Sequence, residues 1–163
     1  MAQVRQPAKK ARGRPPKPKT ENYFAEILSW EIDYSLSGAE KYDFVEEAFW
    51  ESFRVSISGR LIAPAKLAGL SLDISVLGSR RYDEVMTNSR DYSKKAKGVG
   101  SLKVWGQTRE VYVTYPWSAL WGLLPALQAE AVKIVDMHGE ALHRGSALLT
   151  SVAFRHHVNP DDY

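Results

Sequence analysis

The chain has 163 residues, a formal net charge of +3 and no cysteine. The lack of cysteine excludes disulfides, thiolate metal sites and cysteine nucleophiles. No run of 18 apolar residues is present, and no apolar segment closely follows the basic N-terminus as it does in a secretory signal. We therefore expect an intracellular protein, placed in a bacterial cytoplasm or nucleoid, or in a nucleus, without a membrane span.

Charge divides the chain near residue 20. Residues 1–20 contain no acidic residue and carry a charge of +7, from Arg5, Lys9, Lys10, Arg12, Arg14, Lys17 and Lys19. The other 15 basic residues (22 − 7) and all 19 acidic residues give the remainder a charge of −4. Four prolines and little apolar content predict that residues 1–20 are a disordered, extended arm. Residues 21–163 are expected to form a single β-rich domain.

The domain begins with alternating apolar and polar residues. From Tyr23 the large apolar side chains occupy even positions, which predicts a long strand with one buried face made by Phe24, Leu28, Trp30, Ile32, Tyr34 and Leu36. A second run, between Phe49 and Leu61, has its apolar side chains on odd positions, and a third extends from Leu70 to Val76. Such alternation is typical of antiparallel sheets with one solvent-exposed face.

The second half of the chain is read in the same way. Residues 79–100 form a long polar connection, and further strands are expected at residues 102–105, 111–115, 131–137 and 146–155. Residues 117–130 predict the one substantial helix, capped by Ser118 and kinked or divided by Gly122 and Pro125. The sum is mainly β: an antiparallel β-sandwich or curved sheet of about seven strands with one short kinked helix.

The arm contains a short motif. Arg12, Gly13, Arg14 and Pro15 form an Arg-Gly-Arg-Pro core, flanked by basic residues Lys9, Lys10, Lys17 and Lys19. Residues 9–19 thus resemble the AT-hook, a minor-groove DNA-binding motif, with Ala11 as a departure from the usual proline or basic residue. The resemblance implies that these eight residues contact A·T-rich DNA. It covers about a tenth of the chain, and the body resembles no family that we can name.

Physical chemistry supports the same contact. The narrow minor groove of A·T tracts has an enhanced negative potential that attracts arginine side chains. Gly13 lets the backbone approach the groove floor closely, and Pro15 keeps the peptide extended. The flanking lysines reach phosphates, which position the arm without reading sequence. Generic nucleic-acid contact, or a solubilising or nuclear-targeting tail, are the alternatives.

The body offers two further candidate sites. Basic residues interleaved with tyrosines in the long polar connection are a candidate second nucleic-acid contact, made by Arg80, Arg81, Arg90, Lys94, Lys95 and Lys97; a solvated loop is the alternative. Trp117 and Trp121 lie four residues apart, on one face of the expected helix, and are a candidate partner-binding pair. Core packing is the alternative for both tryptophans.

No motif for a cofactor or a catalytic centre is present. Asp136, His138 and His143 surround the last expected hairpin without a metal-ligand spacing, so neither a metal nor a cofactor is expected. The sequence favours a non-enzymatic adaptor whose arm tethers an oligomerisation or protein-binding domain to DNA. An enzyme or ligand-binding sandwich with a localising tail, or an RNA-associated structural protein, remains an alternative.

Overall fold

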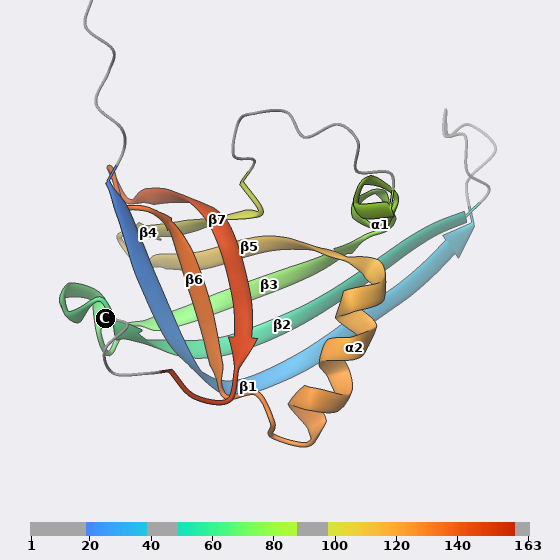
Figure 1. Ribbon diagram of the computed structural model, residues 1–163, viewed down its shortest axis with the longest axis horizontal. Coiled ribbons are helices and arrows are strands. Elements are labelled where there is room, and N and C mark those ends of the chain that lie inside the picture. The colour runs from blue at the N-terminus through green and yellow to red at the C-terminus, as the bar shows by residue number, and fades with distance from the viewer. Residues whose placement is uncertain (1–18, 39–48, 88–97, 159–163) are drawn as a thin grey trace, which may run out of the picture.

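The computed structural model describes residues 19–38, 49–87 and 98–158 (Figure 1). These ranges contain seven strands and two helices: β1 (Thr20–Gly38), β2 (Phe49–Ala63), β3 (Ser71–Ser79), α1 (Arg80–Thr87), β4 (Gly100–Trp105), β5 (Thr108–Pro116), α2 (Trp117–Gln128), β6 (Ile134–Glu140) and β7 (Ser146–Arg155). A single 3₁₀ turn, Ala65–Leu67, lies between β2 and β3. The predicted mainly β class and the number of strands are confirmed.

The strands form one closed barrel in the order β1-β2-β3-β5-β4-β7-β6, and β6 pairs back onto β1. The predicted sandwich is therefore wrong. β1 hydrogen-bonds along both of its edges, so the sheet closes on itself and covers its own apolar face. β3 and β5 are parallel, whereas every other strand pair is antiparallel. The chain that runs from β3 to β5 through α1 and β4 provides the crossover that a parallel pair requires.

Alternation places the core correctly in most strands. Most of the predicted inward side chains of β2 and β3 are buried, namely Phe53, Val55, Ile57 and Leu61 of β2 and Leu72, Ile74 and Val76 of β3. Phe49, which was expected on the same face of β2, is 62% exposed because it lies beyond the end of β3. α2 packs on this core through Leu120, Leu123, Leu124 and Leu127. No polar or charged side chain is buried among the residues that the structure describes.

The long first strand departs from its predicted pattern. Before residue 28 the odd positions face the core, since Tyr23 and Ala25 are fully buried and Ile27 packs against the core. The pairing with β2 shifts register between Ile27 and Ser29, which leaves Leu28 exposed and turns the even positions from Trp30 onward toward the face that carries Phe53 and Val55. Phe24 is buried as predicted, but Ile32, Tyr34 and Leu36, which were also expected to be buried, are 43–57% exposed. A β-bulge of this kind reverses the alternation, so one uniform buried face was the wrong expectation.

The helices also differ from expectation. α1 lies inside the segment that was predicted to be a polar connection. α2 is a single helix that includes Gly122 and Pro125, and Pro116 rather than Ser118 stands at its N-cap position. None of the helices in the described ranges is long and apolar enough to cross a membrane.

Two neighbouring leucines on β7 test the closure of the barrel. Leu149 is fully buried, whereas Leu148 is 42% exposed on the outer face. Leu149→Ala is expected to lower the free energy of unfolding by about 2–5 kcal/mol, because it removes a buried side chain and leaves a cavity. Leu148→Ala should change it by less than about 1 kcal/mol. Denaturant unfolding of both variants measures the difference, and equal losses would contradict the closed barrel.

Candidate interaction surface

The distal ends of β1 and β2 form a two-stranded ribbon. β3 pairs with β2 only from Arg54 onward, and β6 pairs with β1 only as far as Glu26. Tyr34–Gly38 and Phe49–Phe53 are therefore paired with each other alone, and they extend beyond the rest of the sheet (Figure 1). We call these two segments the ribbon. A ribbon of two strands has no second layer of its own to cover its apolar face.

Four aromatic side chains meet where the ribbon joins α2. The Phe53 ring lies 4.5 Å from Trp121 and 5.4 Å from Trp117, measured between ring centroids. Tyr34 lies 6.2–6.4 Å from each of the other three rings. Phe53 is buried, whereas Tyr34 and Trp121 are each about half exposed. Tilted and edge-on rings at these separations attract one another beyond their burial. We call Tyr34, Phe53, Trp117 and Trp121 the aromatic cluster.

Arg80 of α1 is held beside this cluster. Its guanidinium lies 5.1 Å from the centre of the Trp117 ring, and its Nε donates to a carboxylate oxygen of Glu51 at 2.8 Å. The Arg80 Nη2 also contacts Glu51, while the Tyr34 hydroxyl donates to the other Glu51 oxygen at 3.1 Å. The hydrogen bond from Arg80 holds the pKa of Glu51 below its ordinary value. Arg80 thus takes part in an ion pair and a cation–π contact at the cluster.

Of the other basic residues in the candidate second nucleic-acid contact, Arg81 lies among the described residues. It follows Arg80 on α1 and is exposed. Arg90, Lys94, Lys95 and Lys97 lie outside the described residues, as do all the AT-hook residues except Lys19. Lys19 is exposed, and its backbone carbonyl accepts a hydrogen bond from the Ala141 N–H at 2.7 Å, which places the end of the arm beside β6.

Asp83 of α1 fixes the start of α2, and with it Trp117. Its carboxylate accepts hydrogen bonds from the backbone N–H of Trp117 at 2.9 Å and of Ser118 at 3.3 Å, and from the Ser118 hydroxyl at 2.5 Å. An anion at this position also complements the positive end of the helix dipole. The hydrogen bond from the Ser118 hydroxyl, followed by those from the two backbone amides, lowers the Asp83 pKa. A residue distant in sequence therefore does the capping expected of Ser118.

Exposed apolar side chains extend from the cluster along the ribbon. The pairs Ile32–Val55, Tyr34–Phe53, Leu36–Glu51 and Gly38–Phe49 lie directly opposite one another, so their side chains share one face of the sheet. Four large side chains of this face are more than 40% exposed, namely Ile32, Tyr34, Leu36 and Phe49. Trp121 of α2, which lies against Phe53, is 49% exposed. We call these five residues the apolar strip. A contiguous apolar strip at a surface is typical of an interaction site.

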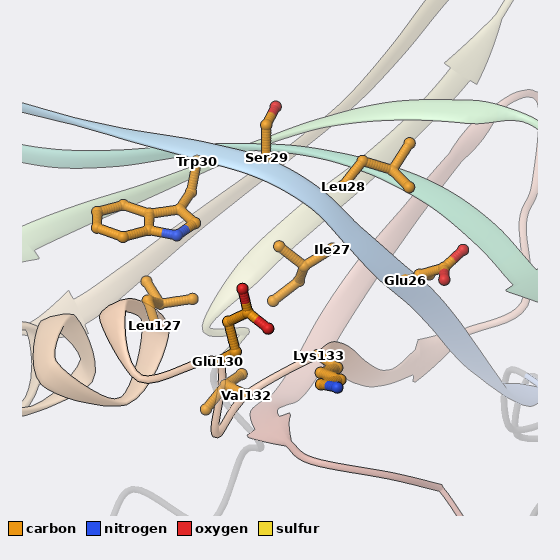
Figure 2. A pocket seen from close by; sticks show the side chains of 9 residues that line it. All are labelled: Glu26, Ile27, Leu28, Ser29, Trp30, Leu127, Glu130, Val132 and Lys133. Carbon is orange, nitrogen blue, oxygen red and sulfur yellow. The ribbon is translucent and has the colours of Figure 1, made fainter.

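A groove continues from the strip along β1. It encloses about 530 Å³ between Glu26–Trp30 and the segment from Leu127 to Lys133 (Figure 2). Figure 2 shows the Trp30 ring beside Leu127, and Ile27 above the segment that carries Val132. Its apolar wall is formed by these side chains, while Glu26, Glu130 and Lys133 bring charge to its margins.

A different aromatic pair, which the sequence did not single out, lies on the outer face of the barrel. Trp105, at the end of β4, is 82% exposed, and Tyr112 of β5 is about 40% exposed. The Lys103 ammonium lies 5.7 Å from the centre of the Tyr112 ring. Trp105, Lys103 and Tyr112 alternate with the inward residues Leu102 and Val111. The sequence does not reveal that Trp105 is exposed, because this depends on which face of β4 points away from the core.

The residues around the last hairpin are engaged with one another. Asp136 pairs with Arg155 at 2.6 Å, and the His138 Nδ1 lies 2.6 Å from the Asn22 side-chain oxygen. Within residues 19–38, 49–87 and 98–158, no three His, Asp or Glu side chains gather closely enough to hold a metal ion.

The described residues define a class of fold: a closed seven-stranded β-barrel, here with aromatic and apolar side chains exposed on one face. No family model, curated protein or solved structure matches the chain. Its function has to be argued from the surfaces themselves.

The Asp83 cap makes a pH-dependent prediction. Asp83→Asn removes the charge and one of the two acceptor oxygens, and should lower the midpoint of thermal unfolding at pH 7 by about 1–3 °C. Because the folded-state pKa of Asp83 is lowered, its contribution is present above the ordinary aspartate pKa and is lost as the pH falls through the folded value. The gap between wild type and variant should therefore close below about pH 4.

Asp73→Asn is the matched control, because Asp73 is exposed on the outer face of β3. It should leave the midpoint close to the wild-type value at both pH values. A gap for Asp83→Asn that stays constant down to pH 3 would show that the carboxylate charge does not stabilise α2.

Proposed function

We propose that the protein is a non-enzymatic, DNA-associated adaptor. Its N-terminal arm binds the minor groove of A·T-rich DNA, and its barrel presents the aromatic cluster and the apolar strip to a protein. The single observation that carries the proposal is the composition of the exposed face: Tyr34 and Trp121 beside the fixed guanidinium of Arg80. Tyrosine, tryptophan and arginine are the residues that most often dominate the binding energy of protein interfaces.

Core packing, the alternative role for the two tryptophans, explains Trp117 better than it explains Trp121. Phe53 is buried and Trp117 is partly buried, so both contribute to packing. Trp121 is 49% exposed although it contacts the same ring of Phe53. A tryptophan that is fixed in place and half exposed loses little conformational entropy when it binds a partner. Its position therefore favours a role in protein binding.

The charge distribution supports the tether. An arm of charge +7 on a body of charge −4 directs DNA to the arm and away from the acidic body. If the arm neutralises about five to seven phosphates, the logarithm of the association constant should fall with the logarithm of salt concentration with a slope of about −4.5 to −6. A single short arm binds weakly, so the body has to add a second contact or a second arm.

The tether is tested with the double variant Arg12→Ala/Arg14→Ala in the full chain. Wild type should bind an A·T-rich duplex more tightly than a G·C-rich duplex at the same salt concentration, and the variant should lose more than about tenfold of the A·T affinity. Lys17→Ala/Lys19→Ala is the control: it should weaken binding to both duplexes alike and make the salt slope shallower. Fluorescence anisotropy measures each affinity, and equal binding of both duplexes by wild type would refute A·T selection.

A second candidate function is contact with single-stranded nucleic acid at the outer face. The observation that favours it is the exposed pair Trp105 and Tyr112 with Lys103 between them. Exposed aromatic rings beside basic side chains stack bases with little sequence preference.

This candidate is tested with Trp105→Ala and with Tyr112→Ala. Each should weaken binding of a thymidine oligomer about tenfold, because stacking of one base contributes about 1–3 kcal/mol. Trp121→Ala, which removes a tryptophan from the opposite candidate surface, is the control and should leave the affinity unchanged. Titrations monitored by anisotropy give the affinities. Unaltered binding by both outer-face variants would eliminate this second function.

A further inference from the structure

Among the described residues, one edge of β1 has no strand partner over half its length. β6 pairs with β1 from Thr20 to Glu26, and the Ile27 N–H then donates to the Lys133 carbonyl at 2.8 Å. From Ser29 to Gly38, β2 is the one strand paired with β1 in the part of the chain that the structure describes. The backbone groups that point away from β2 therefore line a free edge of ten residues, and such an edge is a template for another strand.

This edge has little of the usual protection against pairing. Natural edge strands carry charged side chains, above all lysine, or proline or a bulge. The charged residues here are Glu31 and Asp33, and Asp33 is paired with Arg54 at 2.9 Å. Ser29–Gly38 contains neither lysine nor proline, and the register shifts of β1 lie before Ser29. Ile32, Tyr34 and Leu36 of the apolar strip belong to the same ten residues. A strand added here would satisfy the open backbone groups and place its own side chains beside these on the same face of the sheet.

A second copy of β1 is complementary to the first in one register. With a two-fold axis at Tyr34, antiparallel pairing sets Ile32 opposite the partner's Leu36 on the apolar face. On the other face it sets Asp33 opposite the partner's Ser35 and Glu31 opposite the partner's Ser37. If the axis lies at Ile32, Glu31 is opposite the partner's Asp33. If the axis lies at Asp33, Asp33 is opposite the partner's Asp33. Like charges directly opposite one another destabilise a sheet.

An axis at Ser35 also keeps the acidic residues apart. It sets Ile32 opposite the partner's Gly38, however, so the apolar overlap on which the pairing depends is reduced. A two-fold axis midway between two residues is excluded. It would pair even positions with odd ones, and so place the apolar side chains of one copy on the same face as the polar side chains of the other.

We infer that two copies of this chain pair through the open edge of β1, antiparallel and centred on Tyr34. The inference rests on the proposed function, since it names the partner of the apolar strip. The dimer carries two arms on one particle, so the second arm binds DNA at a high effective concentration. This pairing supplies the additional contact that one weak arm requires.

The register is tested by disulfide cross-linking, because the chain contains no cysteine of its own. Asp33→Cys and Ser35→Cys are prepared separately, mixed in reductant and then oxidised. Residues directly opposite each other in an antiparallel pair have Cα atoms about 4.5–5.5 Å apart, within the range of a disulfide. The mixture should give a covalent dimer in high yield, and each variant alone should stay largely monomeric under denaturing conditions. A dimer from Asp33→Cys alone, or none from the mixture, would overturn the register.

The pairing itself is tested by light scattering on the full chain. Wild type should have twice the chain mass of 18.3 kDa at concentrations on the order of 10 µM. Leu36→Lys, at a residue 57% exposed on the strip, should weaken dimerisation at least about tenfold. Leu148→Lys, at a comparably exposed leucine on β7, is the control and should leave the dimer intact. Circular dichroism verifies that both variants are folded, and a monomeric wild type would refute the inference.

The two proposals fail separately. If the wild-type protein is a monomer that still prefers A·T-rich duplexes, the proposed dimer is refuted and the proposed DNA tether is not. If the protein is a dimer that binds both duplexes with equal affinity, the proposed A·T-selective tether is refuted and the proposed dimer is not. A wild-type monomer whose β1 edge accepts an unrelated extended peptide would assign the edge to a different partner and overturn the second-copy inference.

Discussion

The unequal lengths of β1 and its neighbours determine most of the surface of this protein. β1 has 19 residues, whereas β6, which closes the barrel on its far edge, has 7. Closure therefore uses only the first third of β1. The remainder of β1 continues with β2 past the barrel, because β2 itself has 15 residues. The ribbon, the open edge and the apolar strip are all consequences of this mismatch.

The bulge after Ile27 determines which side chains of the extended part of β1 share a face with Phe53. It reverses the alternation of β1, so the even residues beyond it turn toward the same face as Phe53 and Val55. Without it, Ile32 and Tyr34 would lie on the polar outer face. With it, Tyr34 meets Phe53 and the tryptophans of α2. A local irregularity in one strand thereby assembles side chains that are more than 80 residues apart in sequence.

α1 connects this aromatic assembly to the rest of the molecule. Arg80 joins Trp117 to Glu51 on the ribbon, and Asp83 holds the first turn of α2. Both contacts are made by exposed or partly exposed groups, for which ion-pair energies are small. Their role is to fix orientation: they present Trp121 and Tyr34 to solvent in one arrangement. Orientation of this kind favours binding because less freedom remains to be lost.

The two proposals combine into one physical picture. In this proposal, a basic arm binds DNA weakly and with little sequence information, so a second arm on the same particle is needed. Two copies joined through β1 would provide that second arm. The acidic charge of residues 21–163 would keep the two bodies away from the DNA phosphates.

The sequence by itself determined the strand pattern and the division of charge. Alternation predicted the buried residues of β2 and β3, and the ends of β7 were predicted at residues 146–155, because period-two burial is a local property of a strand. The basic arm and its Arg-Gly-Arg-Pro core were likewise readable from residue types alone. α1 was missed because its segment is short and mostly polar, so the helical spacing of Tyr82, Val85 and Met86 was read as part of a polar connection.

The tertiary structure alone decided which edges pair, and therefore the barrel, the parallel β3–β5 pair and the open edge of β1. Strand partners are chosen by contacts between distant residues, which no local pattern records. The capping of α2 by Asp83 instead of Ser118, and the engagement of Arg80 by Glu51, depend on the same long-range placement. Exposure of Trp105, Trp121 and Leu36 was equally hidden, because an apolar residue in a strand pattern is expected inside until its cover is known to be absent.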